Sequence, residues 1–406
     1  MLAPAAGVNV CGLRVLTLTS LFPSVARPRH GIFVETRLSH LVRDGGVDAR
    51  VIAPVPWFPF TSTAFGQYGR YAATPRRATC DNGLRASYPR YLMLPKVGVA
   101  HQPDSMARAA VRDIAELQRG GWCPEIIDAH YLYPDGVAAA MVADLLKIPL
   151  VITARGTDVN VLGRMPRPAR RIVWATQRAA TVVAVSRRLK EALVEIGVEE
   201  AKVVVLRNGV DLELFRPEAR ATARERLGLP AGRLAACVGN LVPEKGFGLA
   251  IEALRSLDGF RLVVVGEGPS RNELIALARR VGVEERVIFK PSMPQRDLRG
   301  LYSSADVLLL TSTREGWPNV VLESLACGTP VVAVDVGAVG EILTDPAVGR
   351  ILASREPATL ASVVLELLAS GVLPKQIRAH AAMFGWASVS QGQIEVFARA
   401  RAGARR

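Results

Sequence analysis

Short, uninterrupted runs of Val, Ile, Leu and Ala constrain the fold of this chain more than any other feature of its sequence. A strand without polar alternation is buried on both faces, as in a parallel sheet covered by crossover helices. Segments of helical length separate the runs, so the sequence predicts an α/β architecture with parallel sheets. The runs are 13–23, 49–56, 125–134, 149–156, 181–186, 202–209, 233–241, 261–268, 286–291, 305–312 and 330–337.

The length of the chain and a break in this rhythm predict two domains. A chain of 406 residues is too long for one ordinary core. The segment 207–228 interrupts the pattern and carries the turn signals Asn208-Gly209 and Pro217. We expect doubly wound, Rossmann-like domains at 1–210 and 211–385, and a helix of about 386–400 that packs back on the first domain. Two such domains would face each other across a cleft, with the carboxyl ends of their strands toward it.

Composition indicates a folded globular protein, since half of the residues are hydrophobic and 22% are charged. No apolar run reaches about 18–20 residues, so we predict no membrane span. The first residues lack a basic region and are interpreted as leading into a buried strand rather than as a signal peptide. The cysteines form no C-x-x-C pair, and we interpret them as buried, reduced thiols of a cytoplasmic protein. They are Cys11, Cys80, Cys123, Cys237 and Cys327.

The net charge of +14 indicates attraction to anions or an ordinary solvated surface. The anions that it would suit are phosphorylated small molecules, an acidic bilayer and nucleic acid. Charge alone does not choose among them.

Two motifs in the second half follow strand ends and precede helices. In VGNLVPEKG (238–246), Lys245 stands where a loop enters a helix, so it could reach a phosphate that rests on helix N–H groups. The alternative is a solvent-exposed turn lysine. Gly266 and Gly268 form a G-x-G, which is weak support for a ligand and also fits a tight turn.

Two glutamates eight positions apart, Glu315 and Glu323, suggest opposite ends of one ligand. Glu315 lies at a strand mouth, and Pro318 disfavours helix at the residue before it. We expect Asn319 to be the N-cap of a helix that holds Glu323 about one turn inside. The N–H groups of residues 319–321, Val320 among them, would then hold an anion, with a carboxylate on each side for hydroxyl pairs.

These stretches resemble the retaining nucleotide-sugar glycosyltransferases of family 4, of the bacterial polysaccharide-biosynthesis type, which have the GT-B fold. The resemblance rests on the E-x7-E spacing of Glu315 and Glu323, on 325–343 after it, on 238–246 and on 207–217. Weaker matches lie at 30–45, 126–136 and 152–160. The resemblance covers most of the chain and is most specific in the second half.

The resemblance implies a role for each matching residue. Glu315 would hold the donor sugar, Glu323 the ribose and Lys245 the diphosphate. Backbone N–H groups would come from Gly316, Trp317 and Asn319, with Gly239 in the preceding loop. In the first half, His130 would lie near the transferred sugar, although a histidine at a strand end is as often structural. Gly31 would let the first domain approach the donor.

Two positions depart from the family pattern. Asn240 stands where the family has an arginine, so one phosphate ligand is missing. Arg155 stands where a histidine is frequent, and we hypothesise that it partly replaces the missing charge.

The resemblance implies transfer from a nucleoside-diphosphate sugar with retention, the acceptor hydroxyl attacking as the diphosphate leaves. The protein would mainly neutralise charge on the leaving phosphate. No D-x-D pair is placed for a divalent ion, so we expect neither metal nor cofactor. The acceptor would be a glycan or a lipid-linked glycan. The aromatic, basic-ended segment 57–77 suits docking on an anionic bilayer at the inner face of the plasma membrane, or is a solvated surface.

Two other functions remain open from the sequence. Nucleotide-sugar 2-epimerases share the fold and would need no acceptor. A basic protein that binds nucleotides or nucleic acid without catalysis would suit the charge. Aromatic residues are only 6%, however, and no nucleic-acid-binding motif occurs, so we expect no nucleic-acid partner.

Overall fold

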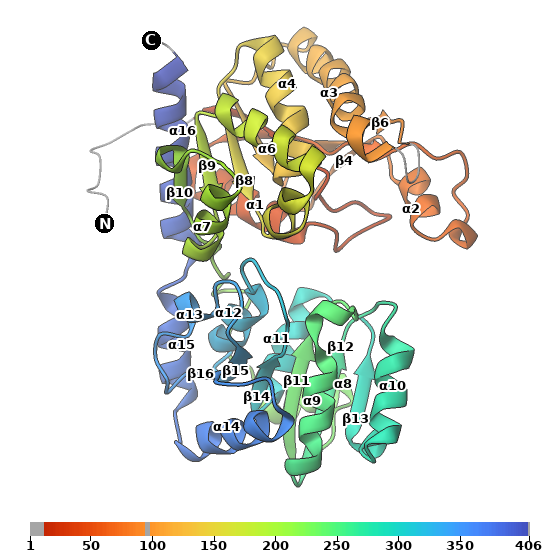
Figure 1. Ribbon diagram of the computed structural model, residues 1–406, viewed down its shortest axis with the longest axis vertical. Helices are drawn as coiled ribbons and strands as arrows, with labels where there is room; N and C mark the ends of the chain where they lie inside the picture. Colours follow the sequence, from red (N-terminus) through yellow and green to blue (C-terminus); the bar gives the residue numbers. More distant parts are fainter. Residues whose placement is uncertain (1–11, 94–97, 405–406) are drawn as a thin grey trace. The chain divides into compact units, whose positions relative to one another are not determined.

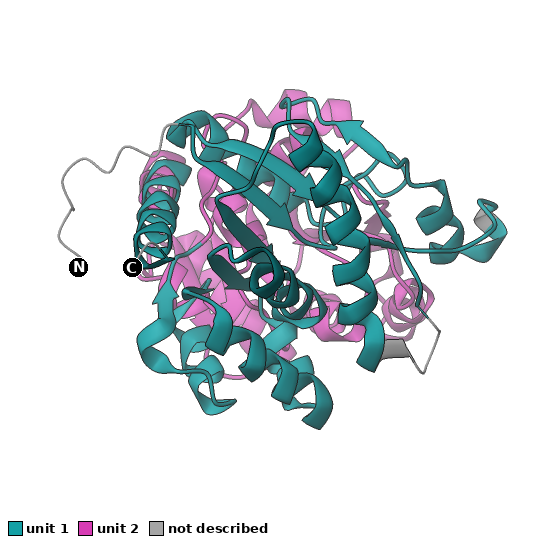
Figure 2. Ribbon diagram, turned by 90° about the horizontal axis from the view of Figure 1, so that it is seen from above, with its two compact units in different colours: residues 1–207, 386–406 teal, residues 208–385 magenta. Residues whose placement is uncertain are grey.

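The computed structural model describes residues 12–93 and 98–404, which divide into two compact units. Unit 1 comprises residues 1–207 and 386–406, and unit 2 comprises residues 208–385 (Figure 2). The chain thus enters unit 2 within the segment where the sequence pattern breaks. The C-terminal helix α16 (Trp386–Ala404) belongs to unit 1, as the sequence suggested, and extends to Ala404.

Unit 1 is built on an eight-stranded sheet in the order β10-β9-β8-β7-β1-β2-β5-β4 (Figure 1). All neighbouring strands are parallel except β4 and β5, which are antiparallel at one edge. The strands are β1 (Arg14–Leu18), β2 (Asp48–Ile52), β4 (Arg77–Thr79), β5 (Arg85–Ser87), β7 (Ile126–His130), β8 (Leu150–Ala154), β9 (Thr181–Ala184) and β10 (Val203–Val205). A separate two-stranded pair joins β3 (Val55–Pro56) to β6 (Arg90–Tyr91).

Helices on both faces bury this sheet. On one face, α1 (Ile32–Gly45) and α16 pack together, and Leu38, Ile394 and Phe397 join the strand residues in one core. On the other, α3 (Gln102–Arg119), α4 (Val137–Leu146) and α6 (Pro166–Arg178) lie side by side (Figure 1). The remaining helices are α2 (Gln67–Ala73), α5 (Thr157–Asn160) and α7 (Arg187–Glu195).

Unit 2 is built on a six-stranded parallel sheet in the order β13-β12-β11-β14-β15-β16. Its strands are β11 (Arg233–Val238), β12 (Phe260–Val265), β13 (Val287–Lys290), β14 (Val307–Leu310), β15 (Val331–Val334) and β16 (Gly349–Leu352). The helices are α8 (Arg220–Leu227), α9 (Phe247–Ala253), α10 (Arg271–Arg280), α11 (Gln295–Ser304), α12 (Asn319–Ala326), α13 (Val339–Ile342), α14 (Pro357–Ala369) and α15 (Pro374–Ala382). Side chains of α9, α10 and α14 form its main core with the strands.

Each predicted apolar run contains a strand, and the parallel α/β architecture is confirmed. The run 49–56 is split, because β2 ends at Ile52 and β3 begins at Val55. The sequence did not predict β4, β5, β6 and β16. These strands are at most four residues long, and arginine interrupts their apolar pattern.

The cysteine interpretation is partly wrong. Cys237 and Cys327 are buried and Cys80 is half-buried, but Cys123 is exposed. Cys123 lies in the loop after α3, where chain turns at the surface. The four described cysteines are free thiols, and Cys11 lies outside the described residues.

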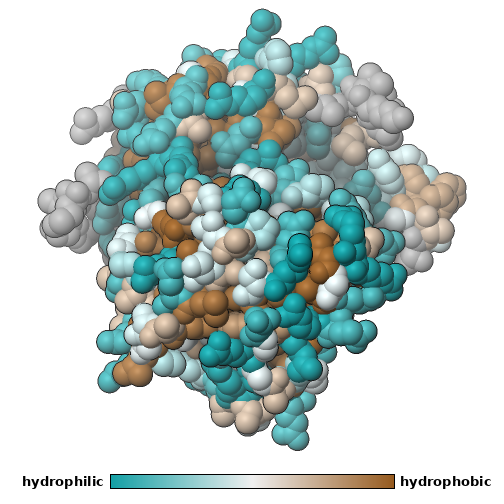
Figure 3. Space-filling view, turned by 60° about the horizontal axis from the view of Figure 1, so that its bottom comes forward, coloured by the Kyte–Doolittle hydropathy of each residue, from teal (hydrophilic) through white to brown (hydrophobic). Residues whose placement is uncertain are grey.

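No single described helix is long and apolar enough to cross a membrane, although the bent pair α14 and α15 passes a test of length and composition. On the face shown in Figure 3, hydrophobic residues form separate areas among hydrophilic ones.

Candidate active site

Two loops at the carboxyl edge of the unit 2 sheet bring Lys245 and Glu315 together. Lys245 ends the short turn Pro243–Lys245 after β11, and Glu315 follows β14. The Lys245 Nζ atom lies 2.6 Å from Glu315 Oε1. The hydroxyl of Ser312 donates to the same carboxylate oxygen over 2.7 Å. One lysine ammonium and one carboxylate are thus fixed side by side at the end of two adjacent strands.

The backbone around this pair is tightly packed. The guanidinium of Arg355 donates to the carbonyls of Ser312 and Thr311, at 2.8 and 3.0 Å. Gly337 has a φ of +54°, and a Cβ there would lie 2.4 Å from the carbonyl oxygen of Glu315. Only glycine suits such a conformation and such a close approach. The loop that carries Glu315 is therefore held from two sides.

Helix α12 begins one residue before the predicted start. Its N-cap is Pro318 and its first residue is Asn319, which makes no side-chain cap. The side chain of Asn319 instead accepts from Asn208 over 3.4 Å, so the predicted N-cap is wrong. The N–H groups of Asn319 and Val321 bond to the carbonyls of residues 317 and 318. Within the described chain, the N–H of Val320 makes no backbone bond of this kind, which leaves it aimed outward from the helix start.

The side chain of Glu323 is held by a hydrogen bond from a tyrosine of the preceding helix. The buried Tyr302, on α11, donates its hydroxyl to Glu323 Oε2 over 2.8 Å. Burial raises the pKa of Glu323 to about 7, and the hydrogen bond from Tyr302 acts in the opposite direction. One carboxylate oxygen is thus committed to the protein, while Oε1 has no such partner in the described chain.

The other predicted donor-binding residues of unit 2 differ in exposure. The side chain of Trp317 is buried, and its ring packs near Phe384 at 6.3 Å between centroids. Only the backbone of Trp317 and of the neighbouring Gly316 is available for the predicted role. Asn240 is exposed in the loop after β11, beside Gly239.

Gly266 and Gly268 serve close packing between two loops. A Cβ on Gly266 would lie 1.9 Å from the carbonyl oxygen of Gly239, and one on Gly268 would lie 2.3 Å from that of Leu241. The N–H of Leu241 also bonds to the carbonyl of residue 267 over 2.8 Å. The tight-turn interpretation of this G-x-G therefore explains it without a ligand.

In unit 1, His130 is enclosed and uses both ring nitrogens. It ends β7 with only 1% of its surface exposed. Its Nε2 lies 3.1 Å from Asp128 Oδ2, and its Nδ1 lies 2.7 Å from a guanidinium nitrogen of Arg155. Burial lowers the pKa of His130 to about 4, Asp128 raises it and Arg155 lowers it. A neutral ring that donates to Asp128 and accepts from Arg155 satisfies this arrangement.

Arg155 follows β8 and is held within unit 1. Its guanidinium lies over the ring of Phe33 at 5.0 Å, and burial lowers its pKa to about 9. Gly31, the N-cap of α1, has a φ of +72°, and a Cβ there would lie 2.2 Å from the carbonyl of Leu21. The close approach of the Leu21 backbone, within unit 1, is enough to explain why residue 31 is a glycine.

Sequence reasoning missed three residues that position the predicted ones. Tyr302 and Asn208 lie 21 and 111 positions from their partners Glu323 and Asn319. Ser312 is only three positions before Glu315 but sits in a run interpreted as strand. Local spacing gave no signal for the distant pairs, because tertiary packing alone brings them together.

Two family descriptions together match most of the chain. Residues 220–383 match the family described as glycosyl transferases group 1, and residues 35–214 match glycosyltransferase family 4. A Bacillus subtilis protein, TuaC, named for glycosyltransferase action in teichuronic acid biosynthesis, is 32% identical over 81% of this chain and 83% of its own length. A D-inositol 3-phosphate glycosyltransferase of Acidothermus cellulolyticus is 34% identical, over 71% of this chain and 70% of that one.

Solved structures with this fold cover nearly the whole chain. Sucrose-phosphate synthase of Thermosynechococcus elongatus superposes with a TM-score of 0.74 and 19% identity, over 95% of this chain and 98% of that one. HepE of Anabaena, crystallised with UDP, gives a TM-score of 0.70 at 20% identity, with the same shares covered. At these identities the structures support the fold alone.

Proposed function

The chain belongs to glycosyltransferase family 4 and has the GT-B fold, and we propose that it transfers a sugar from a nucleoside diphosphate to an acceptor hydroxyl with retention of the anomeric configuration. The observation that carries the proposal is the contact of Lys245 with Glu315 at the carboxyl edge of the unit 2 sheet, with Glu323 on helix α12, which follows the Glu315 loop. Ligands of doubly wound sheets bind at the carboxyl ends of their strands.

Lys245 would stabilise the leaving diphosphate. Its ammonium has three N–H bonds, and the contact with Glu315 uses one of them. The N–H of Val320 would add a second donor at the start of α12. Preorganised donors of this kind contribute about 3–4 kcal/mol each to transition-state stabilisation. We therefore propose that Lys245 supplies the positive charge that a metal ion supplies in other transferases, so that transfer is metal-independent.

The two glutamates would orient the donor by its hydroxyl groups. Glu315, held by Lys245 and Ser312, would accept from hydroxyls of the transferred sugar, and Glu323, held by Tyr302, would accept from the ribose. Both carboxylates already have protein partners, so we assign neither as a nucleophile. The acceptor hydroxyl would attack on the face that the diphosphate leaves.

We propose that His130 and Arg155 act as one unit. The neutral ring accepts from the guanidinium and donates to Asp128, which fixes the direction of Arg155. The hypothesis that Arg155 offsets the charge missing at Asn240 is tested by the nucleotide affinity of Arg155→Ala, and an unchanged affinity would contradict it.

For the acceptor, we propose a glycan or a lipid-linked glycan in cell-surface polysaccharide synthesis, reached from the cytoplasmic side of the plasma membrane. The relative named for teichuronic acid biosynthesis supports this class. Exposed aromatic side chains of segment 57–77 would add peripheral contact with an anionic bilayer. Trp57, Phe60 and Phe65 are 53%, 56% and 45% exposed, and Phe58 packs against the two phenylalanines. Loss of sedimentation with anionic vesicles in the Trp57→Ser, Phe60→Ser, Phe65→Ser variant would support that contact.

A thermal-shift panel in EDTA tests the donor site. UDP, GDP and ADP, alone and as sugar conjugates, are added to the whole chain. At about 100 times its Kd, the right nucleotide should add about 2.7 kcal/mol to the free energy of unfolding. Glu323→Gln should lose the shift, whereas Glu285→Gln, which removes an exposed carboxylate of unit 2, should keep it. The absence of a shift with any nucleotide would contradict the donor site.

The reaction itself is separated from epimerisation by its products. With donor but no acceptor, a 2-epimerase would convert the sugar, whereas this protein should leave it unchanged apart from slow hydrolysis. With an acceptor extract, NMR of the new glycosidic bond should show the anomeric configuration of the donor. The opposite configuration would contradict retention.

A further inference from the structure

The edge of the unit 1 sheet has two unlike faces. On the inner face, Val51 and Ala86 pack into the core with α1. Because side chains alternate along a strand, the residues next to Val51 on β2 and next to Ala86 on β5 point to the opposite face of the sheet. That face carries five polar residues from β2, β5 and β4, which are Arg50, Arg85, Ser87, Arg77 and Thr79.

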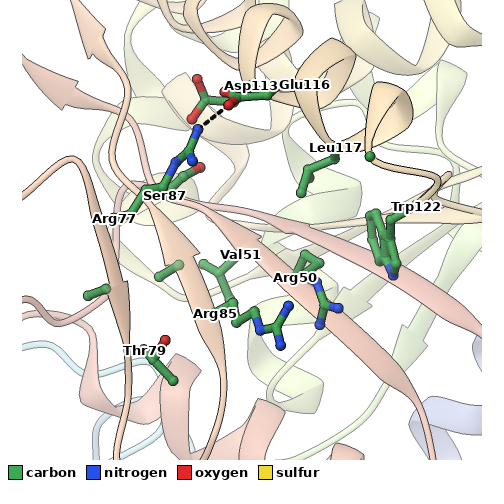
Figure 4. A pocket seen from close by; sticks show the side chains of 13 residues that line it. Arg50, Val51, Arg77, Thr79, Arg85, Ser87, Asp113, Glu116, Leu117 and Trp122 are labelled. Carbon is green, nitrogen blue, oxygen red and sulfur yellow. Dashed lines mark ion pairs between the residues drawn. The ribbon is translucent and has the colours of Figure 1, made fainter.

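These polar side chains form the floor of a cavity of about 600 Å³ (Figure 4). Its walls are Asp113, Glu116 and Leu117 of α3, together with Trp122 from the loop before β7. The volume is in the range of small-molecule sites. His130 ends β7 and Arg155 follows β8, whereas this floor is made by β2, β5 and β4, so the cavity is a separate place in unit 1.

Most charges in the cavity have partners, but one arginine does not. Arg50 lies 2.9 Å from Asp48 Oδ1 and 5.5 Å over the ring of Trp122, whose Nε1 donates to Asp48 over 2.7 Å. Arg77 and Glu116 form an ion pair at 2.5 Å. The exposed side chain of Arg85 makes neither a hydrogen bond nor an ion pair with any residue of 12–93 or 98–404.

The unpartnered Arg85 stands directly beside another arginine. Arg50 and Arg85 are register partners on parallel strands, and Figure 4 shows their side chains side by side on the floor. Like charges in opposed positions of a sheet repel each other. An oxyanion between two guanidinium forks would remove that repulsion and accept several N–H bonds at once.

The opposite wall offers groups of the other kind. Asp113 accepts from the hydroxyl of Ser87, and burial raises the pKa of Asp113. Glu116 adds further oxygen atoms at this end, and Leu117 gives an apolar surface, whereas Thr79 lies on the floor as the register partner of Arg85. Carboxylates and hydroxyls at one end of a cavity suit the hydroxyl groups of a sugar. The two arginines at the other end suit an anionic substituent.

We propose that this cavity binds a saccharide that carries an oxyanion, either a carboxylate or a phosphate. The oxyanion lies between Arg50 and Arg85, and the sugar hydroxyls face Asp113, Glu116 and Ser87. The site is additional to the donor site and serves a charged segment of the acceptor or of the product. The inference of an oxyanion depends only on the two arginines, whereas the inference of a saccharide depends also on the proposed function.

The test uses the whole chain labelled with 5-fluorotryptophan. The protein has five tryptophans, so the ¹⁹F spectrum has few signals, and Trp122→Phe and Trp317→Phe assign two of them. Trp122 reports on the cavity, and Trp317, in the loop before α12, reports on the donor site. The probes are glucuronate, glucose 6-phosphate, glucose and inorganic phosphate. In separate titrations, UDP, GDP and ADP are added and the Trp317 signal is observed, so failure of the donor site is distinguishable from failure of the cavity.

We expect a saturable shift of the Trp122 signal with glucuronate, glucose 6-phosphate or both, and none with glucose. A response to only one of the two charged sugars identifies the oxyanion. Arg85→Gln should weaken binding at least tenfold, while Arg108→Gln, which removes an exposed charge of α3 outside the cavity, should leave it unchanged.

Four results would overturn the proposal. The first three are no shift of Trp122 with either charged sugar, glucose binding as tight as theirs, and binding by Arg85→Gln equal to that of the natural chain. Inorganic phosphate that shifts Trp122 as strongly as glucose 6-phosphate would also overturn it, because it would show an anion site without saccharide recognition.

Discussion

Burial and a tyrosine hydroxyl act on Glu323 in opposite directions. Burial raises the pKa of this carboxyl to about 7, and the hydroxyl of Tyr302 lowers it through a 2.8 Å hydrogen bond. Near neutral pH the residue therefore exists in both protonation states. A carboxylate accepts hydrogen bonds from a ribose diol better than a carboxylic acid does.

We predict that nucleotide affinity depends on pH through Glu323. Below about pH 7 the carboxyl is mostly protonated, so the Kd should rise as pH falls from 8 to 5.5, by up to about tenfold per pH unit. Isothermal titration across this range measures the change. Glu323→Gln should bind weakly with a flat profile. A profile in the variant as steep as in the natural chain would assign the dependence to another group.

Tyr302→Phe tests the support of Glu323 without touching the ligand. Loss of the hydroxyl removes one hydrogen bond to a partly buried carboxylate, which is worth about 1–3 kcal/mol. It should also raise the pKa of Glu323 further, because the bond favours the charged form. We expect nucleotide binding at pH 7 to weaken about five- to tenfold and to recover partly at pH 9. Tyr68→Phe, on α2 of unit 1, is the control and should change neither.

The donor-binding roles of Glu315, Glu323 and Lys245 were predicted from their spacing and their places after strand ends, and these roles stay predictions. Their contacts could not be predicted in the same way. Tyr302 lies on another helix, and nothing near Glu323 in sequence points to it. Arg155 was predicted as a charge for the donor, but its contact with His130 depends on two strand ends that lie side by side.

At the scale of elements, the strands buried on both faces were predicted because a continuous apolar run is visible in the local sequence, without knowledge of the strands that pair with it. The edge strand β4 and its neighbour β5 were missed, since each has three residues and an arginine of each lines a cavity. The start of α12 was misplaced by one residue. Pro318 occupies the N-cap position, and Asn319 turns its side chain to Asn208 instead of to its own helix.

The loop pair of Glu315 and Gly337 allows a matched glycine test. Gly337 and Gly371 have φ values of +54° and +68°, so alanine is strained by about 1–2 kcal/mol at either position. Only at Gly337 does a Cβ meet another loop, at 2.4 Å from the Glu315 carbonyl oxygen, whereas Gly371 has nothing within 4 Å. We predict that Gly337→Ala weakens nucleotide-sugar binding beyond its loss of stability. Gly371→Ala should lose stability alone, and calorimetry with each variant measures both. Equal binding by the two would mean that the loop position does not matter.

At the scale of the molecule, the chain leaves unit 1 after residue 207 and returns at residue 386. The returning helix α16 is part of the core of unit 1, because Ile394, Val396 and Phe397 are buried against its strands and α1. Unit 1 is therefore complete only after unit 2 has been synthesised. A truncation before α16 would leave an apolar face of unit 1 exposed.

Phe397→Ala tests this dependence without truncation. Phe397 is fully buried, and removal of a buried phenylalanine ring costs about 3–5 kcal/mol. We predict that unit 1 of this variant unfolds at a lower urea concentration than unit 1 of the natural chain. Hydrogen exchange of the amides in β1 and β7 measures this unfolding. Leu365→Ala removes a side chain of α14 in unit 2 that is 41% exposed, and it should change this exchange little. Exchange in β11 and β12 should respond weakly to Phe397→Ala, because unit 2 has its own core of α9, α10 and α14. If those amides lose protection as much as β1 does, the two units unfold as one cooperative body, and α16 stabilises the whole chain rather than the unit that it completes.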